Sequence, residues 1–290
     1  SDAEKGNYSK LYNKGTLELR NIGVASEYLP KKFIIKEGIF KINQDKMSFN
    51  NFLAAYGQSD FKMNGYLQNV FNYATTNTGV LKGSFKVSAR YINVDEFMSQ
   101  TSANTSVTKA PAPKTETKTE PEQTGVIIIP TNLNLQLLAN AQKVNFDKLN
   151  LQNATGYLTM NKGKLTMQNT GFNLIGCNVS MNANYQAVTP QKANFDYAIK
   201  ASDFDIKRAY NEIEVFRKMA SAAEKAQGIV SLDYKLKGRL NGNMDPVYPS
   251  LVGGGVLSVK DVKVRGLKMF NAVSKQTSSE SMKNPDVSKV

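Results

Sequence analysis

Residues 156–185 read GYLTMNKGKLTMQNTGFNLIGCNVSMNANY, and this stretch decides the fold. On either side of the Asn-Lys-Gly-Lys sequence at 161–164, apolar residues alternate with polar ones. That alternation is the period of a strand with one apolar and one solvated face, and an Asn/Gly turn between two such runs is typical of a hairpin. A second pair of alternating runs flanks Gly176. The stretch therefore predicts two consecutive β-hairpins.

The same pattern occurs 118 residues earlier, at residues 38–66. The alignment pairs turn residues with turn residues and apolar residues with apolar ones: Gly38/Gly156, Asn43/Asn161, Lys46/Lys164, Met47/Leu165, Asn51/Asn169 and, after a one-residue slip, Gly57/Gly176 and Tyr66/Tyr185. Such self-similarity indicates stacked copies of one supersecondary unit. We predict a mainly β protein in which tandem antiparallel hairpin units form an extended curled sheet or groove.

The rest of the chain divides around these two copies. We expect a first β unit at 16–98, a flexible linker at 99–124, a second unit at 125–228, a third, partial unit at 229–274 and a disordered tail at 275–290. The linker lacks an apolar period and is rich in Thr, Pro, Lys and Glu. Short helices are expected where strands end, as at 93–98.

One longer amphipathic helix is predicted at about 205–227. Ile206, Tyr210 and Ile213 recur at helical spacing, an Asp at 203 or 205 can cap the first turn, and Gly228 is placed to end the helix. We expect its apolar stripe to pack on the sheet and bury those three side chains. The alternative is a helix that lies on a membrane surface.

Composition argues against several classes of enzyme. The chain of 290 residues contains no histidine, which excludes Ser-His-Asp and Cys-His catalysis and His-ligated zinc. Its single cysteine, Cys177, follows a turn glycine and is expected to be a buried, unreactive thiol. We expect no enzymatic activity, no cofactor and no metal; a β-repeat lyase that uses Lys and Tyr as acid and base is an alternative.

The formal net charge of +13 is typical of proteins with anionic partners such as nucleic acid, acidic glycans or lipid headgroups, but scattered lysines that simply solubilise polar strand faces are the favoured alternative. The lysines are dispersed along polar strand faces, and the charges of residues 99–124 are balanced, so nucleic acid is not expected as a partner. The apolar run at 126–129, VIII, ends at Pro130 and reads as a strand; it is far shorter than the roughly 18 residues that span a bilayer. The start carries no signal peptide and both ends look like cuts, so any export signal or anchor is expected outside this sequence.

The C-terminal third carries a family resemblance. The strand ending at Gly238, the turn at 244–246, the run GGGVLSVKD at 253–261 and the Arg-Gly-Leu step at 265–267 resemble the C-terminal region of AsmA-like proteins. The upstream hairpins resemble the repeated units of that region. The sequence departs from the family pattern at 262–264, where a glycine-bearing turn is expected. Gly253, Gly254 and Gly255 lack the Gly-Lys-Ser/Thr ending of a phosphate loop and indicate strand crowding instead.

The resemblance implies a function. AsmA-like and TamB-type bridge-like proteins are held in the inner membrane of Gram-negative bacteria by an N-terminal helix and project a curled β-sheet into the periplasm, where it carries phospholipid for outer-membrane biogenesis. By that resemblance this chain is a periplasmic module, tethered to the inner membrane by a segment outside the sequence given. Its partners would be phospholipid or a membrane surface, together with envelope proteins.

The residues themselves are consistent with a lipid groove. A 16-carbon chain in water costs on the order of 10 kcal/mol, so a lipid carrier needs a continuous apolar surface. The strand faces supply candidates for that surface: Phe40, Ile42, Met47, Phe49, Leu158, Met160, Leu165, Met167, Val179 and Met181. Two alternatives remain open: these residues pack as an ordinary core, or the chain is a non-catalytic envelope module that recognises glycan or protein through its polar face.

Overall fold

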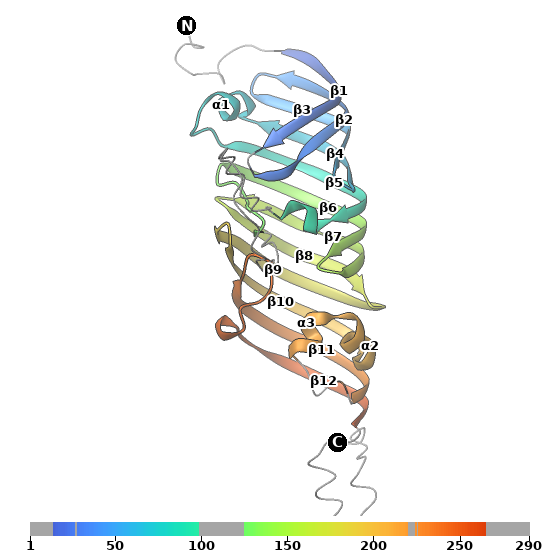
Figure 1. Cartoon of the computed structure of the whole chain (residues 1–290). Helices are drawn as coiled ribbons and strands as arrows, with labels where there is room; N and C mark the ends of the chain where they lie inside the picture. Colours follow the sequence, from blue (N-terminus) through green and yellow to red (C-terminus); the bar gives the residue numbers. More distant parts are fainter. Residues whose placement is uncertain (1–13, 27, 99–124, 220–223, 225, 265–290) are drawn as a thin grey trace, which may run out of the picture.

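The computed structural model describes residues 14–26, 28–98, 125–219, 224 and 226–264. They form one sheet of twelve strands whose order in space is their order in the sequence (Figure 1). The strands are β1 (Lys14–Ser26), β2 (Leu29–Asn43), β3 (Lys46–Tyr56), β4 (Ser59–Gln68), β5 (Leu81–Asn93), β6 (Leu133–Phe146), β7 (Leu149–Asn161), β8 (Lys164–Leu174), β9 (Cys177–Thr189), β10 (Lys192–Asp205), β11 (Ala226–Leu240) and β12 (Val252–Val264). The predicted mainly β fold is confirmed.

Both predicted double hairpins are present, and their irregularities repeat as well. β2, β3 and β4 form the first, and β7, β8 and β9 form the second. The pairing register shifts between Phe49 and Phe52 in the first copy and between Met167 and Thr170 in the second, 118 residues later. The two segments are therefore copies of one unit.

A parallel pair joins the two copies. β5 and β6 run in the same direction, with Phe85 opposite Leu137, whereas the other neighbouring strands are antiparallel. Parallel neighbours require a crossover connection, and residues 99–124, which the sequence predicts as a linker, lie outside the described residues. The sheet then continues to β12 without a break, so the boundary expected at residue 229 falls inside β11.

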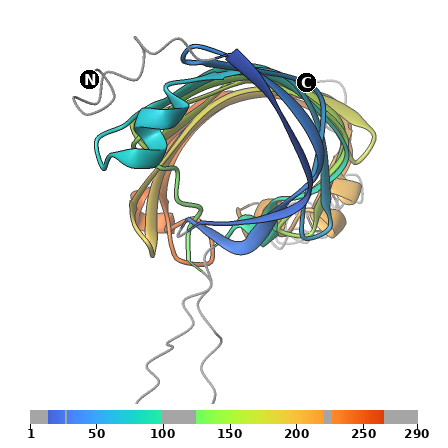
Figure 2. The same ribbon diagram turned by 90° about the horizontal axis from the view of Figure 1, so that it is seen from above.

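The sheet curls around a central axis, as the view from above shows (Figure 2). Strands twist in one sense, and β-bulges bend them further. Residues with positive φ lie inside several strands and mark such irregularities: Asn21, Asn51, Asn153, Asn169 and Asp203. Asn and Asp adopt this conformation more readily than other non-glycine residues. Among the described residues, β1 and β12 each pair on one side only, so the curl is not closed.

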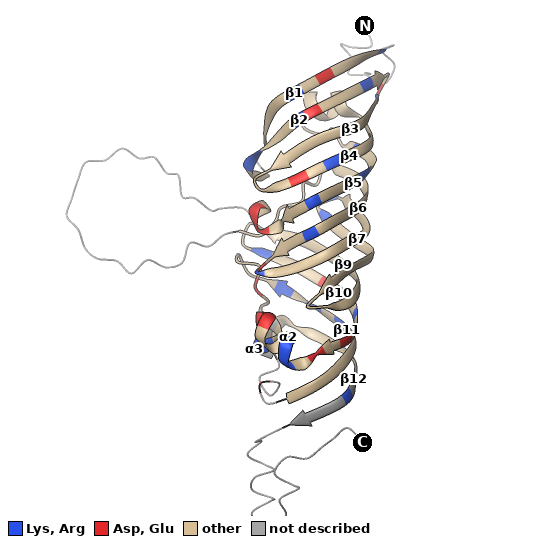
Figure 3. Ribbon diagram, turned by 90° about the vertical axis from the view of Figure 1, so that its right-hand side faces the viewer, with Lys and Arg blue, Asp and Glu red and all other residues tan. Residues whose placement is uncertain are grey.

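The apolar face of the sheet is its inner face. Phe40 and Leu236 are buried although no second sheet lies over them in the described part of the chain, whereas their strand neighbours Lys41 and Lys237 are exposed. Side chains crowd on the inner side of a curve and spread apart on its outer side. Lys and Arg positions are spread along the sheet without one concentrated cluster (Figure 3).

Short helices and loops leave the sheet at both rims. At one rim lie α1 (Val70–Thr75), residues 125–132 and the β11–β12 loop with a 3-10 turn, η4 (Tyr248–Ser250). At the other lie a 3-10 turn, η2 (Val94–Phe97), and the helices α2 (Ile206–Glu212) and α3 (Glu214–Met219). The short helix expected at 93–98 is thus confirmed, while residues 265–290, with the expected tail, lie outside the described part.

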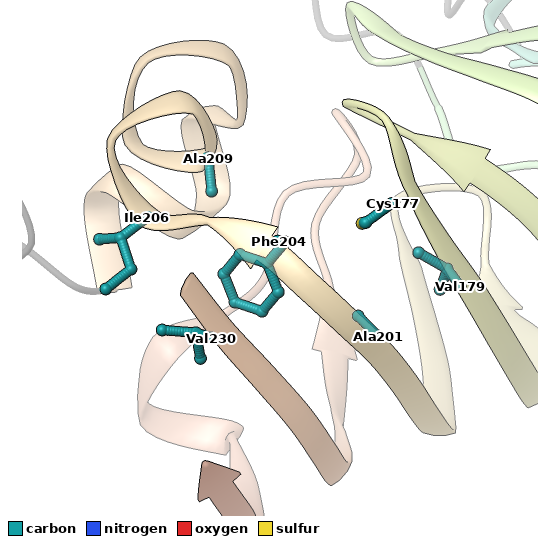
Figure 4. Close-up of a cluster of buried hydrophobic side chains, with 7 residues drawn as sticks. All are labelled: Cys177, Val179, Ala201, Phe204, Ile206, Ala209 and Val230. Atoms are coloured by element: carbon teal, nitrogen blue, oxygen red, sulfur yellow. The ribbon is translucent and has the colours of Figure 1, made fainter. Parts of the chain in front are cut away.

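The predicted single helix at 205–227 is wrong in extent. The Asp205 side chain caps α2 by accepting the Arg208 N–H at 2.7 Å, as expected, but Ile213 (φ −112°, ψ 102°) breaks the helix. The break brings both Ile213 and Phe216 against the buried cluster of Figure 4, which is formed by Cys177, Val179, Ala201, Phe204, Ile206, Ala209 and Val230. Ile206 is buried, whereas Tyr210 and Ile213 are half-buried. Gly228 does not end the helix, because it lies in β11.

The prediction of a strand at residues 126–129 is also wrong. These residues lie outside the strand ladder, and they pack on the inner face against Tyr185 and Ala193. A short apolar run is typical of any buried extended segment, so its periodicity could not distinguish the two.

Candidate functional site

One apolar row crosses the whole sheet on its inner face. Because each strand is in register with the next, one residue from every strand belongs to this central row: Leu17, Phe40, Phe49, Gly65, Phe85, Leu137, Leu158, Met167, Ala183, Tyr197, Leu236 and Gly253. The row contains no charged residue and no polar group other than the Tyr197 hydroxyl.

A second row lies beside it, two residues along each strand. This rim row runs from β1 to β11 and consists of Gly15, Ile42, Met47, Leu67, Gly83, Leu135, Met160, Leu165, Tyr185, Phe195 and Gly238. On the other side of the central row, β8 to β12 contribute Thr170, Met181, Ile199, Tyr234 and Gly255. We call these three rows together the trough.

The outer face has the opposite character. The row that alternates with the central one reads Thr16, Lys41, Ser48, Tyr66, Ser84, Gln136, Thr159, Thr166, Asn184, Asp196, Lys237 and Val252. Apart from Val252 on the edge strand, every one of these side chains carries a polar group. The contrast between adjacent rows extends over twelve strands, whose spacing of about 4.8 Å makes the trough roughly 50 Å long.

The structure brings the ten sequence-predicted residues onto this one inner face. Phe40, Phe49, Leu158 and Met167 lie in the central row, and Ile42, Met47, Met160 and Leu165 lie in the rim row. Met181 belongs to the third row of the trough, and Val179 lies one row farther, in the cluster beside α2. Phe40, Phe49 and Val179 are buried, whereas the other seven are half-buried.

The two ends of the trough differ in how they are filled. In the N-terminal half, phenylalanine rings pack against one another: Phe49 lies 5.8 Å from Phe40, 5.6 Å from Phe52 and 5.9 Å from Phe85, measured between ring centroids. In the C-terminal half the central row carries Met167, Ala183, Tyr197, Leu236 and Gly253, and the Tyr197 ring stacks on Phe195 of the rim row at 5.8 Å. Packing as an ordinary core therefore describes the phenylalanine rings around Phe49 better than it describes the half-buried Met167 and Met181.

The rim beside the C-terminal half holds residues that sequence reasoning missed. The hydroxyl of Tyr185 donates to the carbonyl of Ile127 at 2.8 Å, and the Val126 N–H donates to the carbonyl of Pro190 at 2.8 Å. Burial raises the pKa of Tyr185, although the hydrogen bond to Ile127 acts in the opposite direction. The apolar run at 126–129 was the only sequence signal for this contact. The run does not indicate which face of the sheet residues 126–129 cover.

The outer face bears two shallow hollows between β8 and β12, of about 390 Å³ and 940 Å³. Thr166 donates to Asn184 at 2.9 Å and Asn184 donates to Asp196 at 2.9 Å; all three residues border the larger hollow, and Asn184 and Asp196 border the smaller one as well. Lys237 borders both hollows, and Asp196 is the acidic residue that they share.

Metal ligands and the cysteine thiol of the described part of the chain do not form a further candidate site. Within it, no cluster of acidic, cysteine or histidine side chains could hold a metal ion. Cys177 is buried and its thiol donates to the Leu174 carbonyl at 3.0 Å; burial raises the pKa of that thiol. No described helix has the length and apolar character needed to cross a bilayer.

Comparison with known proteins assigns the chain to no family. No protein-family model matches the chain, and no curated protein matches it in sequence.

Proposed function

We propose that this chain binds phospholipid acyl chains in the trough and allows them to move along it. The observation that supports the proposal is the central row, because it offers an apolar surface across all twelve strands that no second sheet covers among the described residues. An ordinary β-sandwich would bury such a face against another sheet.

The dimensions fit the ligand. One lipid leaflet accounts for about half of the roughly 30 Å hydrocarbon core of a bilayer. A trough of roughly 50 Å is therefore about three acyl chains long. Each buried CH₂ contributes about 0.8 kcal/mol wherever it contacts apolar side chains, so a chain can shift along the half-buried part of the row with little change in energy. The flexible methionine side chains of the C-terminal half suit chains of variable shape.

The cellular setting follows from the resemblance to AsmA-like proteins, which remains part of the proposal. In that setting the module lies in the periplasm of a Gram-negative bacterium, a membrane anchor lies outside the sequence given, and lipid moves toward the outer membrane. Of the residues that carry the resemblance, Gly238 lies in β11, residues 244–246 lie in the turn that follows β11, and residues 253–261 lie in β12, whereas residues 265–267 lie outside the described part.

Two adjacent leucines provide a matched test. Leu137 belongs to the central row, between Phe85 and Leu158, whereas Leu138 faces outward between Lys86 and Tyr157; both are half-buried. Leu137→Gln places a polar amide in the middle of the trough, and Leu138→Gln places the same amide on the outer face. We expect the first substitution to reduce uptake of a fluorescent phospholipid about tenfold or more, since several CH₂ contacts and the continuity of the row are lost, and the second to leave uptake unchanged.

Native mass spectrometry of the protein after mild extraction from cells supplies the second measurement. Copurified phospholipid supports the proposal. Equal uptake by the two leucine variants, with no lipid on the native protein, would overturn it.

The outer-face hollows favour one alternative, a module that recognises glycan through the Thr166–Asn184–Asp196 ladder. Hydroxyl, amide and carboxylate groups arranged in this way match the donors and acceptors of a sugar. Bound oligosaccharide in the same mass spectra, together with loss of binding in Asn184→Ala, would support this alternative over the lipid proposal.

A further inference from the structure

The rim segment, residues 125–132, already occupies part of the trough. Val126 is fully buried and Ile129 is 8% exposed, and both pack on a strip formed by Met160, Leu165, Tyr185 and Ala193. Met160, Leu165 and Tyr185 are consecutive members of the rim row. An apolar segment of the chain therefore lies on the surface that the proposed function assigns to lipid.

The segment resembles an acyl chain in size and in chemistry. Four residues span about 13 Å when fully extended, close to the roughly 15 Å of one leaflet's hydrocarbon. Its side chains at 126–129 are one valine and three isoleucines, so its contact with the strip is aliphatic. Because the segment lies outside the strand ladder, it can leave the strip without breaking the sheet.

We propose that the strip of Met160, Leu165, Tyr185 and Ala193 is an acyl-chain subsite, and that residues 126–129 fill it in the lipid-free protein. This inference rests on the proposed function and adds an internal occupant that competes with the lipid. Binding of an acyl chain at the strip displaces the rim segment toward solvent.

Tyr185 specifies the class of ligand. Its buried hydroxyl donates to the Ile127 carbonyl at 2.8 Å and also lies 3.7 Å from the Met244 sulfur, so departure of the segment would leave this donor with the weak thioether acceptor alone. A buried hydroxyl that loses its strong acceptor is costly, so the favoured ligand brings its own carbonyl. An acyl ester does so, since its carbonyl lies at the head of the hydrocarbon chain.

The first experiment loosens the segment without touching the strip. Val126→Ser combined with Ile129→Ser weakens the internal competitor, and Val188→Ser combined with Val252→Ser is the control, because those valines are 60% and 62% exposed. The probe is a phosphatidylethanolamine with a fluorophore on one acyl chain, present as a trace in phosphatidylglycerol vesicles. We expect the affinity of the loosened variant to rise about tenfold, as removal of a competing occupant allows, and that of the control to stay unchanged.

The second experiment uses the native protein, so it does not depend on a variant that folds. The Val126 amide donates to Pro190 at 2.8 Å, and its hydrogen exchange should become faster when phospholipid is added. Tyr185→Phe should remove the preference for an ester-linked probe over its ether-linked analogue.

The outcomes separate the two proposals. If the native protein takes up lipid but the loosened variant gains no affinity and Val126 exchange does not change, the rim segment is a fixed wall and the subsite proposal is wrong. If no form of the protein takes up lipid, the proposed function itself fails and the subsite fails with it.

Discussion

The backbone N–H of Asn169 donates to the side-chain oxygen of Asn182 at 2.8 Å, and Asn51 makes the same bond to Asn64 at 2.8 Å. Both pairs are related by the offset of 118 residues, and both donors have positive φ, 49° and 54°. The Asn51–Asn64 pair holds a bulge in β3, and the Asn169–Asn182 pair holds the matching bulge in β8. The bond satisfies a backbone N–H at a point where the register of the ladder shifts.

We expect Asn169→Val to destabilise the protein by about 1–3 kcal/mol, because a β-branched residue is strained at positive φ. Asn169→Gly, which adopts this conformation freely, should cost much less. Urea denaturation of the two variants measures the difference. Equal stability would show that the bulge relaxes on substitution and does not constrain the curl.

Much of this fold could be predicted from the sequence because it depends on patterns among residues that are close together in the chain. Alternation specifies which side chains share a face, and Asn/Gly turns specify where strands reverse, so the hairpins of β2–β4 and β7–β9 and the common face of the ten candidate residues were predictable. The parallel pair of β5 and β6 was not, since it joins residues on either side of a long connection. The helix break at Ile213 could not be predicted from the sequence, because it depends on how Ile213 and Phe216 pack against the buried cluster around Phe204 in the folded chain.

The position of the rim segment at the candidate site also could not be predicted from the sequence. Its four apolar residues are typical of a buried strand, and only the position of Tyr185 and Pro190 in three dimensions determines that they lie across strand ends instead.

The glycine triplet of β12 provides a second prediction. A Cβ on Gly253 would lie 2.6 Å from the Lys235 carbonyl oxygen, whereas a Cβ on Gly254 would meet nothing within 4 Å. Gly253→Ala should therefore force β12 away from β11 and speed hydrogen exchange in both strands. Gly254→Ala should be neutral or slightly stabilising, since alanine has less freedom to lose on folding. If both variants exchange alike, crowding is not the reason for the triplet.

The Asp60–Arg90 pair makes stability depend on pH. The Asp60 carboxylate accepts the Arg90 side-chain N–H at 2.8 Å and the backbone N–H groups of Arg90 and Tyr91 at 2.9 Å each. Burial acts to raise the pKa of Asp60, but these hydrogen bonds and the nearby guanidinium outweigh it and lower that pKa. A lowered pKa contributes stability above the pKa of the unfolded chain, and this contribution is lost as pH falls through the folded value.

Asp60→Asn should consequently lower the free energy of unfolding by about 1–2 kcal/mol at neutral pH. The difference from the native protein should shrink below pH of about 4, where the unfolded carboxyl protonates. Arg90→Gln and the double variant complete a cycle, and the two losses should not add because they remove one shared interaction. A difference that persists in strong acid would assign the effect to packing rather than charge.

The last prediction concerns how open each end of the trough is. Phe49 is 5% exposed and touches three other phenylalanine rings, whereas Met181 is half-buried on the same face. Phe49→Ala should cost about 3–5 kcal/mol, as for a filled core, while Met181→Ala should cost less than the roughly 2 kcal/mol at the low end for buried methionine. Lipid uptake should respond in the opposite order, falling more for Met181→Ala once both variants are confirmed as folded by circular dichroism. If Met181→Ala is as costly as Phe49→Ala, side chains fill the C-terminal half as well, and no apolar surface there remains for an acyl chain to occupy.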